Sequence, residues 1–402
     1  MAPAGNFECL AAAIQGGADS VYFGVGQLNM RSHSANNFAP GDLEKVCEIC
    51  RQHGVKSYLT LNIVLYDDDL EPMREALRSA RKAGVTAVIA SDMAAIAYAR
   101  SIGMEVHIST QLSISNSESL RFYSQFADVI VLARELNLGQ VKEIKRIIDT
   151  EGICGPSGRP LAIEMFCHGA LCMAISGKCY LSLHEYGASA NRGACYQICR
   201  RGYEVTDLET GAKLLVDNKY IMSPKDLCTI EFMDRIIDAG VTVFKIEGRA
   251  RSSEYVKTVT RAYRDAADAV MEGRYTPELA ASLKKRLETV FNRGFWDGYY
   301  QGARLGEWSD VYGNKATRTK TYAGRITNYF GKLNVAEVLV ESGDISVGDE
   351  VLICGPTTGV IEYVIPEIRV DLKNVQTAHK GEYCSIPVEE RLRRSDKVYL
   401  FK

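Results

Sequence analysis

Residues 56–109 read KSYLTLNIVLYDDDLEPMREALRSARKAGVTAVIASDMAAIAYARSIGMEVHIS, and this stretch decides the expected fold. Three apolar, β-branched runs lie in it, at 56–65, 86–90 and 105–109. Such runs predict buried strands, because a strand covered on both faces is hydrophobic along its whole length. The segments between them, 69–82 and 92–101, have apolar positions three and four residues apart, which predicts amphipathic helices. Strands that alternate with helices predict a parallel sheet.

The same alternation continues on both sides of this stretch. Further strands are expected at 20–24, 128–133, 161–166 and 242–248, with MAPAG at 1–5 as the remnant of a first strand. Further helices are expected at 41–52, 114–125 and 136–148. Eight strands, each followed by a helix, predict an α/β fold of the (β/α)8 TIM-type barrel over residues 1–310. An open doubly wound sheet is the alternative.

The sequence changes character after about residue 310. Residues 316–402 contain short alternating runs broken by Gly, Asp and Asn, without a helical period. This pattern predicts a second domain, a small antiparallel β-barrel or sandwich, with the boundary near WSDVYGNKATRTK at 308–320. Two domains also suit the length of 402 residues, because one hydrophobic core stops growing at about 250 to 300 residues.

The composition is that of an ordinary soluble globular protein, with 46% hydrophobic residues and a formal net charge of -2. This charge gives no global indication of nucleic-acid binding. The N-terminal segment lacks the basic start of a signal peptide, and no run of about 18 apolar residues occurs, so a cytoplasmic location is expected. Twelve cysteines are many for a reducing compartment, so clustered ones indicate metal, redox or catalytic roles.

Five cysteines are concentrated after the expected strand 161–166. EMFCHGALCMAISGKC at 164–179 and RGACYQICRR at 192–201 contain Cys167, Cys172, Cys179, Cys195 and Cys199. Active sites of (β/α)8 barrels lie at the C-terminal ends of the strands, so this long loop is the expected site. Four thiolates can hold zinc or an iron–sulfur cluster, and the C-x6-C and C-x3-C spacings leave the choice open. Three glycines allow the loop to curl around an ion: Gly169, Gly177 and Gly193.

The other cysteines are predicted to be small buried hydrophobes, with one exception. The buried set is Cys9, Cys47, Cys50, Cys154, Cys354 and Cys384. The exception is Cys228, which follows SPKDL at the start of a predicted helix. Before it, residues 203–217 predict a small hairpin around the turn LETG.

The stretch EMFCHGALCMAISGKCYLS at 164–182 resembles the signature of the U32 family, which is named for peptidases and collagenases. The matching positions are Glu164, Phe166, Gly169, Ala170, Leu171, Cys172, Gly177, Cys179, Leu181 and Ser182. Further blocks resemble those of the family in the family's order, across the whole expected barrel: APAGN, GADSVYFG, NMR, STQLSISN, NRGAC, DLC, KIEGRARS and FNRGFWDGYY. The C-terminal segment is similar to the small translation-factor-like barrel that longer members append.

This resemblance implies an enzyme similar to the tRNA hydroxylation proteins, which form 5-hydroxyuridine at the wobble position and depend on prephenate. It implies a [4Fe-4S] cluster with Cys172, Cys179, Cys195 and Cys228 as ligands. Cys199 is a fifth thiol that can take the place of one of them, and zinc is the alternative metal. The expected partners are tRNA and a prephenate-like acid. The alternative functions are a U32-type peptidase and a non-catalytic RNA-binding protein with a zinc-stabilised loop.

No hydrolase motif supports the peptidase alternative. H-E-x-x-H, D-[ST]-G and G-x-S-x-G are all absent from the sequence. Cys167 and His168 are the candidates for a cysteine protease. Adjacent residues of an extended segment point to opposite sides, however, which is a poor geometry for a nucleophile and its base.

Two residues of the signature region are candidates for catalysis. Glu164, at the end of a strand, is expected to be a general base or an organiser of the cysteine-rich loop, and an ion pair with an arginine is its structural alternative. His168 is expected to tune a cluster or to bind substrate, and a hydrogen bond to the backbone is its structural alternative.

Four more polar residues near strand ends are candidates for substrate binding. Arg31 and Arg249 could clamp the two carboxylates of a prephenate-like acid, although a salt bridge, with Glu247 for Arg249, is an equal alternative. His107 and Gln111 in HISTQ are expected to point toward the same mouth.

The expected RNA-binding surface is a basic stripe on the helix after strand 242–248. Lys257, Arg261 and Arg264 recur there at helical spacing, which predicts a row of phosphate contacts. A solvated helix face is the alternative. RLRRSDK at 391–397 and KATRTK at 315–320 add further basic groups.

Overall fold

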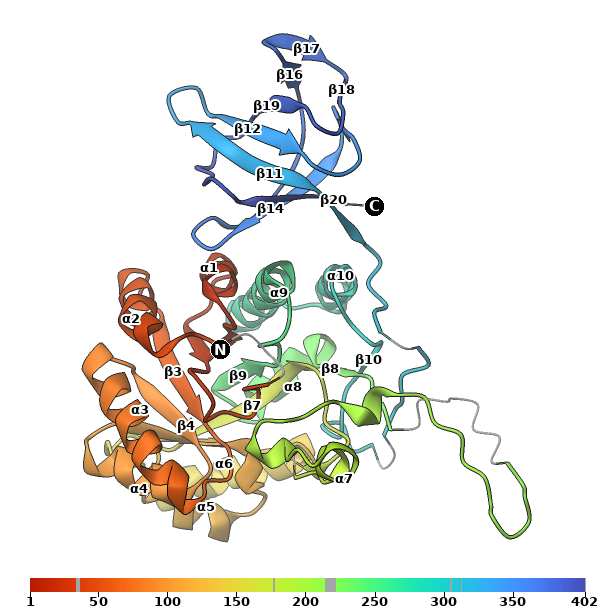
Figure 1. The fold of residues 1–402 in the computed structure, drawn as a ribbon. Coiled ribbons are helices and arrows are strands. Elements are labelled where there is room, and N and C mark those ends of the chain that lie inside the picture. Colours follow the sequence, from red (N-terminus) through yellow and green to blue (C-terminus); the bar gives the residue numbers. More distant parts are fainter. Residues whose placement is uncertain (34–36, 176–177, 214–221, 304–305, 312, 402) are drawn as a thin grey trace.

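The computed structural model describes residues 1–33, 37–175, 178–213, 222–303, 306–311 and 313–401. The N-terminal part is a largely parallel sheet with helices on its outer side, and the C-terminal part is an antiparallel sheet (Figure 1). The chain therefore consists of a mixed α/β part followed by a β-rich part, as the sequence predicts.

The parallel strands follow one another in the sheet in chain order. They are β1 (Ala2–Pro3), β2 (Ser20–Phe23), β3 (Lys56–Leu61), β4 (Ala87–Ala90), β5 (Glu105–Ile108), β6 (Val129–Val131), β7 (Ala162–Gly169) and β9 (Val243–Ile246), which pairs with β7. The helices of this part are α1 (Phe7–Gln15), α2 (Leu43–Gln52), α3 (Leu70–Ala83), α4 (Met93–Ser101), α5 (Ser117–Ser124), α6 (Leu138–Glu151), α8 (Met233–Asp238), α9 (Ser253–Met271) and α10 (Pro277–Glu288). The strand order never reverses, so it is not the order of a doubly wound sheet.

The predicted closed (β/α)8 barrel is not confirmed. Among the described residues, β1 and β9 share no β-ladder, although the Ile246 N–H donates to the Met1 carbonyl at 3.1 Å next to them. The parallel sheet is thus confirmed, and its closure stays a prediction.

Local sequence explains where these elements begin and end. The strands β2 and β4 are buried at every position, as expected for apolar runs covered on both faces. Helix α6 begins at a capping box, in which Asn137 and Gln140 exchange side-chain bonds to each other's backbone N–H groups at 3.0 and 2.9 Å. It ends at Gly152, whose φ of 63° is in the left-handed region that glycine favours.

The chain between β7 and β9 is the longest excursion from the parallel sheet. It contains α7 (Leu181–Tyr186) and β8 (Asp226–Cys228), which is antiparallel to β7 and parallel to β10 (Phe295–Trp296). Of the predicted hairpin at 203–217, the described residues show one antiparallel bridge, Thr206 with Lys213, and residues 214–217 lie outside the described part. Gly177 also lies outside it.

The C-terminal part has the predicted antiparallel sheet. Its order is β15-β14-β20-β11-β12-β19-β16-β17, and β13 pairs separately with β18. The bounds are β11 (Lys320–Phe330), β12 (Val335–Val340), β13 (Ile345–Ser346), β14 (Glu350–Gly355), β15 (Gly359–Val364), β16 (Ile368–Val370), β17 (Lys373–Val375), β18 (Thr377–Ala378), β19 (Tyr383–Pro387) and β20 (Lys397–Phe401). The described pairings do not form a closed ring, so a small barrel is not confirmed.

The antiparallel sheet rests on helices α1 and α9 of the N-terminal part, and Figure 1 shows both helices directly beneath it. The Gln15 side chain donates to the Thr358 carbonyl and accepts from the Val360 N–H, both at 2.9 Å. The Lys257 ammonium donates to the Val360 carbonyl at 2.8 Å. These polar contacts fix β15 against the two helices.

The cysteines predicted to be buried hydrophobes are buried, except one. Cys9, Cys47, Cys50, Cys354 and Cys384 are enclosed in hydrophobic clusters. The prediction for Cys154 is wrong, because this residue lies in the surface turn after α6, bridged to Pro160, and is exposed. Among the described helices, none is both long and apolar enough to cross a membrane.

Candidate functional site

A cavity of about 510 Å³ opens where the parallel strands end. Residues that follow six of these strands line it: Arg31 after β2, Asn62 after β3, Gln111 after β5, Arg134 after β6, Ala170 after β7 and Glu247 after β9. Much of the remaining wall comes from the described residues of the segment 170–200, which we call the cysteine loop. The loop therefore lies at the C-terminal ends of the strands, as the sequence predicts.

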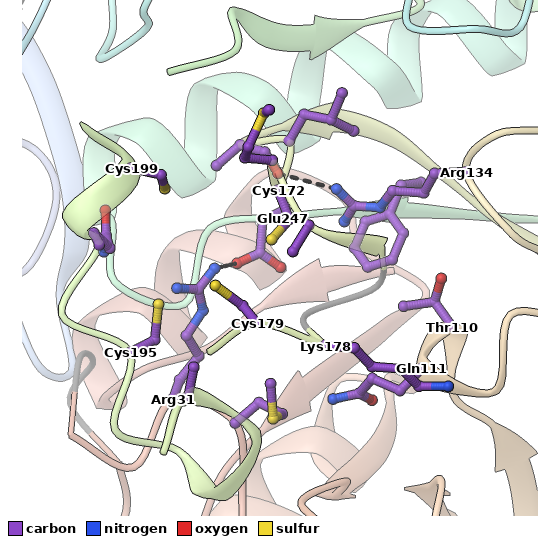
Figure 2. Close-up of a pocket in the computed structure, with 18 of the residues that line it drawn as sticks. Arg31, Thr110, Gln111, Arg134, Cys172, Lys178, Cys179, Cys195, Cys199 and Glu247 are labelled. Carbon is purple, nitrogen blue, oxygen red and sulfur yellow. Dashed lines mark hydrogen bonds and ion pairs between the residues drawn. The ribbon is translucent and has the colours of Figure 1, made fainter. Parts of the chain in front are cut away.

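Four cysteines of the cysteine loop line this cavity: Cys172, Cys179, Cys195 and Cys199. Figure 2 shows these four side chains around the ion pair of Arg31 with Glu247. Burial raises the pKa of the Cys199 thiol to about 11, and the neighbouring three thiols act in the same direction. The Cys199 thiol therefore lies within electrostatic range of the other three.

The fifth candidate, Cys228, does not line the cavity. It ends β8 opposite His168, and its sulfur accepts a weak hydrogen bond from the Tyr263 hydroxyl at 3.8 Å. Burial raises the pKa of the Cys228 thiol to about 11. Three of the four predicted ligands thus share the cavity, and the fourth thiol there is Cys199.

The donor chemistry of the cavity suits a thiolate-bound metal or cluster, since four thiols are the number that closes a zinc or iron–sulfur site. Within the described ranges, however, no three His, Cys, Asp or Glu side chains converge as a ligand set. The ligands therefore stay a prediction, and a bound ion or cluster would require the cysteine loop to draw its sulfurs together.

Two glycines let the cysteine loop approach the rest of the cavity wall. Gly169 has a φ of 102°, and a Cβ on it would overlap the Glu247 carbonyl oxygen. Gly193 has a φ of 92°, and a Cβ on it would lie 2.7 Å from the Asn29 carbonyl oxygen. A side chain at Gly169 would push the start of the loop away from Glu247, and one at Gly193 would push the loop away from Asn29.

Basic side chains outnumber acidic ones in the remaining lining. Eight of them face two carboxylates: Arg31, Arg134, Arg200, Arg249, Arg251, Arg293, Lys178 and Lys245, with Glu135 and Glu247. A concave surface with such an excess of positive charge concentrates anions.

Both arginines of the predicted carboxylate clamp line the cavity. Arg31 forms an ion pair with Glu247 at 2.9 Å, which raises the pKa of the guanidinium. Arg249 instead donates to the Asn29 and Thr60 side chains at 3.0 and 2.9 Å. Burial lowers the pKa of Arg249 to about 10, so it stays charged at neutral pH. No carboxylate among the described residues is its ion-pair partner, so the partner of Glu247 is Arg31.

Four further arginines of the cavity were not predicted from the sequence: Arg134, Arg200, Arg251 and Arg293. Arg134 donates to the Ala170 carbonyl at 3.1 Å and lies over the Phe166 ring, 3.7 Å from its centre. Arg251 lies over the Phe291 ring at 3.6 Å. Arg134 follows β6 as Arg31 follows β2, so the argument from strand ends could have found it.

The predicted general base, Glu164, is fully buried and does not line the cavity. Its carboxylate accepts from the Lys245 ammonium at 2.7 Å and lies 3.4 Å from Nδ1 of His107. Burial alone would raise the pKa of Glu164, but Lys245 and His107 outweigh it and lower the pKa to about 2. Lys245 itself lines the cavity, so Glu164 positions an ammonium group at the cavity floor.

His107 lies in this buried cluster and Gln111 in the cavity wall. Nε2 of His107 is 3.3 Å from Glu105, and burial, which lowers the pKa of His107, is outweighed by the two carboxylates, which raise it. His107 is not part of the described cavity lining, in contrast to the prediction. Gln111 is, and it exchanges hydrogen bonds with Asn62 at 2.9 and 3.0 Å.

Cys167 and His168 are both buried in β7, away from the cavity. Burial raises the pKa of the Cys167 thiol to about 12, and this thiol donates to the Lys245 carbonyl at 3.4 Å. Burial lowers the pKa of His168 to about 3, so its ring is neutral where it packs against Tyr263 and Phe295. A protonated, inaccessible thiol is not an activated nucleophile.

The predicted RNA-binding stripe on α9 is engaged within the chain. Lys257 contacts β15, Arg261 pairs with Asp265 at 2.9 Å, and Arg264 pairs with Asp19 and with Asp268. RNA binding by these three residues stays a prediction, but they do not form a row of unpaired charges.

Residues 5–310 match the family model described as Peptidase family U32. The chain is 60% identical over 401 residues to a collagenase of Porphyromonas gingivalis, covering 100% of this chain and 97% of that protein. It is 33% identical over 365 residues to tRNA hydroxylation protein P1 of Bacillus subtilis, covering 89% and 83% of the two chains. It is 36% identical over 314 residues to the 23S rRNA 5-hydroxycytidine C2501 synthase of Escherichia coli, covering 76% and 46%.

Proposed function

This chain belongs to peptidase family U32, and we propose that it is a tRNA-modifying enzyme that contributes to 5-hydroxyuridine formation at the wobble position. The proposal includes a [4Fe-4S] cluster, a prephenate-like acid as co-substrate, and a cytoplasmic location, where tRNA is found. Its main support is that four thiols and several arginines without carboxylate partners line one cavity, which suits a cluster beside a small anion. The relatives named for tRNA and rRNA hydroxylation agree with it.

The thiols of the cavity would be the ligands of the cluster. Cys172, Cys179 and Cys195 would hold the cluster, with Cys199 or Cys228 as the fourth ligand. When bound, such a cluster supplies electron transfer. Charge-assisted, two-pronged hydrogen bonds are the strongest that arginine makes with carboxylates.

Arg249 and Arg134 would bind the carboxylates of the acid, because neither guanidinium has a carboxylate partner among the described residues. Arg31, oriented by Glu247, would complete the clamp. The Lys245 ammonium, fixed by Glu164 at the cavity floor, would hold a proton next to the bound acid.

A peptidase is the second candidate, favoured by the relative named collagenase at 60% identity. It would need a nucleophile or a metal-bound water. The buried, protonated Cys167 is a poor nucleophile, and cleavage that persists in Cys172→Ser and Cys179→Ser but not in Cys167→Ser would revive this candidate.

Anaerobic purification tests the cofactor. About four iron and four sulfide per chain with visible absorption would support the cluster, whereas stoichiometric zinc without colour would overturn the redox mechanism and favour a zinc-stabilised binding protein. Cys172→Ser should lose the iron, and Cys154→Ser is the matched control, because Cys154 is exposed and lies outside the cavity.

Nucleoside analysis of tRNA from a deletion strain tests the reaction. We expect 5-hydroxyuridine to fall and to return with the wild-type chain or Cys154→Ser, but not with Cys172→Ser. An unchanged 5-hydroxyuridine level in the deletion strain would reject this substrate.

A further inference from the structure

A second concave surface lies on the antiparallel sheet, outside the residues that the family model matches. Its volume is about 580 Å³, and β11 and the segment 391–395 form its main walls. Four arginines line it: Arg325, Arg391, Arg393 and Arg394. We call this surface the arginine groove.

Of these four arginines, only Arg325 forms an ion pair with a described carboxylate. Arg325 forms an ion pair with Glu341 at 3.1 Å, and the Glu337 carboxylate in the lining accepts from the Thr327 hydroxyl. Arg391 and Arg394 are exposed and form no ion pair with any described carboxylate, including the preceding acidic residues 389–390. The groove thus differs from the basic stripe on α9, whose charged side chains already bond to other residues of the chain.

The backbone that carries these arginines is fixed before any ligand binds. Leu392 is buried in the core of the sheet, whereas Arg391 and Arg394 are exposed on either side of it. The Asp396 carboxylate accepts from the Arg393 N–H at 2.7 Å, and the Ser395 N–H donates to the Ile326 carbonyl at 2.8 Å. Binding of a ligand would therefore cost little conformational entropy of the backbone.

Aromatic side chains complete the groove. Tyr383 on β19 is 56% exposed in the lining, and Tyr329 on β11 is fixed by hydrogen bonds of its hydroxyl to the Val388 and Glu389 carbonyls at 3.0 and 3.2 Å. Guanidinium groups that pair with phosphates, beside a ring on which a base can stack, are the combination that recognises single-stranded nucleic acid.

We propose that the arginine groove binds a single-stranded segment of RNA through Arg391, Arg394 and Tyr383. This inference rests on the proposed function, because that function makes RNA the substrate. The groove would then bind RNA away from the cavity in which the modified base reacts.

Fluorescence anisotropy of the full-length protein with a labelled oligouridylate of about 12 nucleotides tests this inference. The double variant R391Q/R394Q should bind roughly tenfold more weakly, and its plot of log affinity against log salt should be shallower by about 1.4, since a single strand releases about 0.7 counterion per phosphate contact. The matched control K373Q/K380Q removes two exposed charges of the same sheet outside the groove and should change neither quantity.

Two results would overturn the inference: equal losses in both double variants, or a polyglutamate peptide that competes as well as the oligouridylate, which would identify an acidic protein as the ligand. Y383A should weaken oligouridylate binding but leave the slope unchanged. The two proposals can fail separately. If the deletion strain has unchanged tRNA nucleosides but the groove still binds RNA in a salt-dependent way, only the proposed reaction is rejected.

Discussion

The cysteine-lined cavity and the buried charge cluster of Glu164, Lys245, His107 and Glu105 differ in how far their charged side chains have partners of opposite charge. In the cluster, Glu164 is bonded to Lys245 and His107, and His107 to Glu105, so each charge has a partner. In the cavity, Arg249 is buried without a carboxylate partner in the described chain. A desolvated charge costs free energy unless it is paired. The charges of the cluster therefore compensate one another, whereas the charge of Arg249 has no carboxylate partner among the described residues, as the proposed binding of an acid requires.

Glu164→Gln breaks the cluster and should have the largest effect. It would leave the Lys245 ammonium buried without its carboxylate, and the free energy of unfolding should fall by about 3 to 5 kcal/mol. Urea unfolding measures this loss. The control Glu143→Gln removes an exposed surface carboxylate that pairs with Arg146 outside the cluster, and it should leave the free energy of unfolding nearly unchanged. Similar losses in the two variants would contradict the distinction between the cluster and the surface.

Acid should weaken the same cluster in a predictable window. The pKa of Glu164 is lowered from 4.5 to about 2, so its contribution is fully present above pH 4.5 and is lost as the pH falls toward 2. Over this window the wild type should lose about 3 kcal/mol more than Glu164→Gln does. Urea titrations of both proteins at several pH values check this, and parallel pH curves would refute it.

Arg249→Gln should affect the cavity rather than the fold. Removing one charge-assisted contact to a carboxylate costs about 2 kcal/mol, so calorimetry with prephenate should show about thirtyfold weaker binding. The free energy of unfolding should fall by no more than about 1 kcal/mol, because Asn29 and Thr60 are neutral partners. The exposed Arg146→Gln is the control. If Arg249→Gln destabilises the protein but leaves prephenate binding unchanged, the role of Arg249 is structural.

Thiol alkylation should separate the two regions without changing stability. In the metal-free protein, iodoacetamide should modify the exposed Cys172 of the cavity early, together with the exposed surface residue Cys154. Cys167, whose thiol is buried and has a pKa of about 12, should react only after unfolding. Mass spectrometry of the digested protein gives the order. Early modification of Cys167 would show that β7 opens to solvent.

The sequence predicted the positions of most elements because apolar runs and helical periods are local properties. It also placed the cysteine loop correctly at the C-terminal ends of the strands. It could not distinguish a side chain that faces the cavity from one that faces the sheet interior. Glu164 and Lys245 illustrate this limit: both lie in apolar strands, and only the three-dimensional pairing of β7 with β9 joins them.

The cysteines show the same limit. The family resemblance implied Cys228 as a ligand with Cys199 as its possible replacement, but the antiparallel pairing of β8 with β7 buries Cys228 beside Tyr263. Cys154 was misjudged because cysteine is usually buried, while the turn that bridges it to Pro160 holds it at the surface. Long-range pairing and turn geometry, neither of which a local pattern contains, decide both cases.

The contact of β15 with α1 and α9 limits how the protein can be divided. Leu352, Cys354 and Val360 of the antiparallel sheet belong to the same hydrophobic cluster as the buried face of α1. A chain cut near residue 310 would expose that face to water and invite aggregation. The two parts therefore depend on each other for folding. A loss of activity in a truncated protein would first have to be separated from aggregation before it said anything about catalysis.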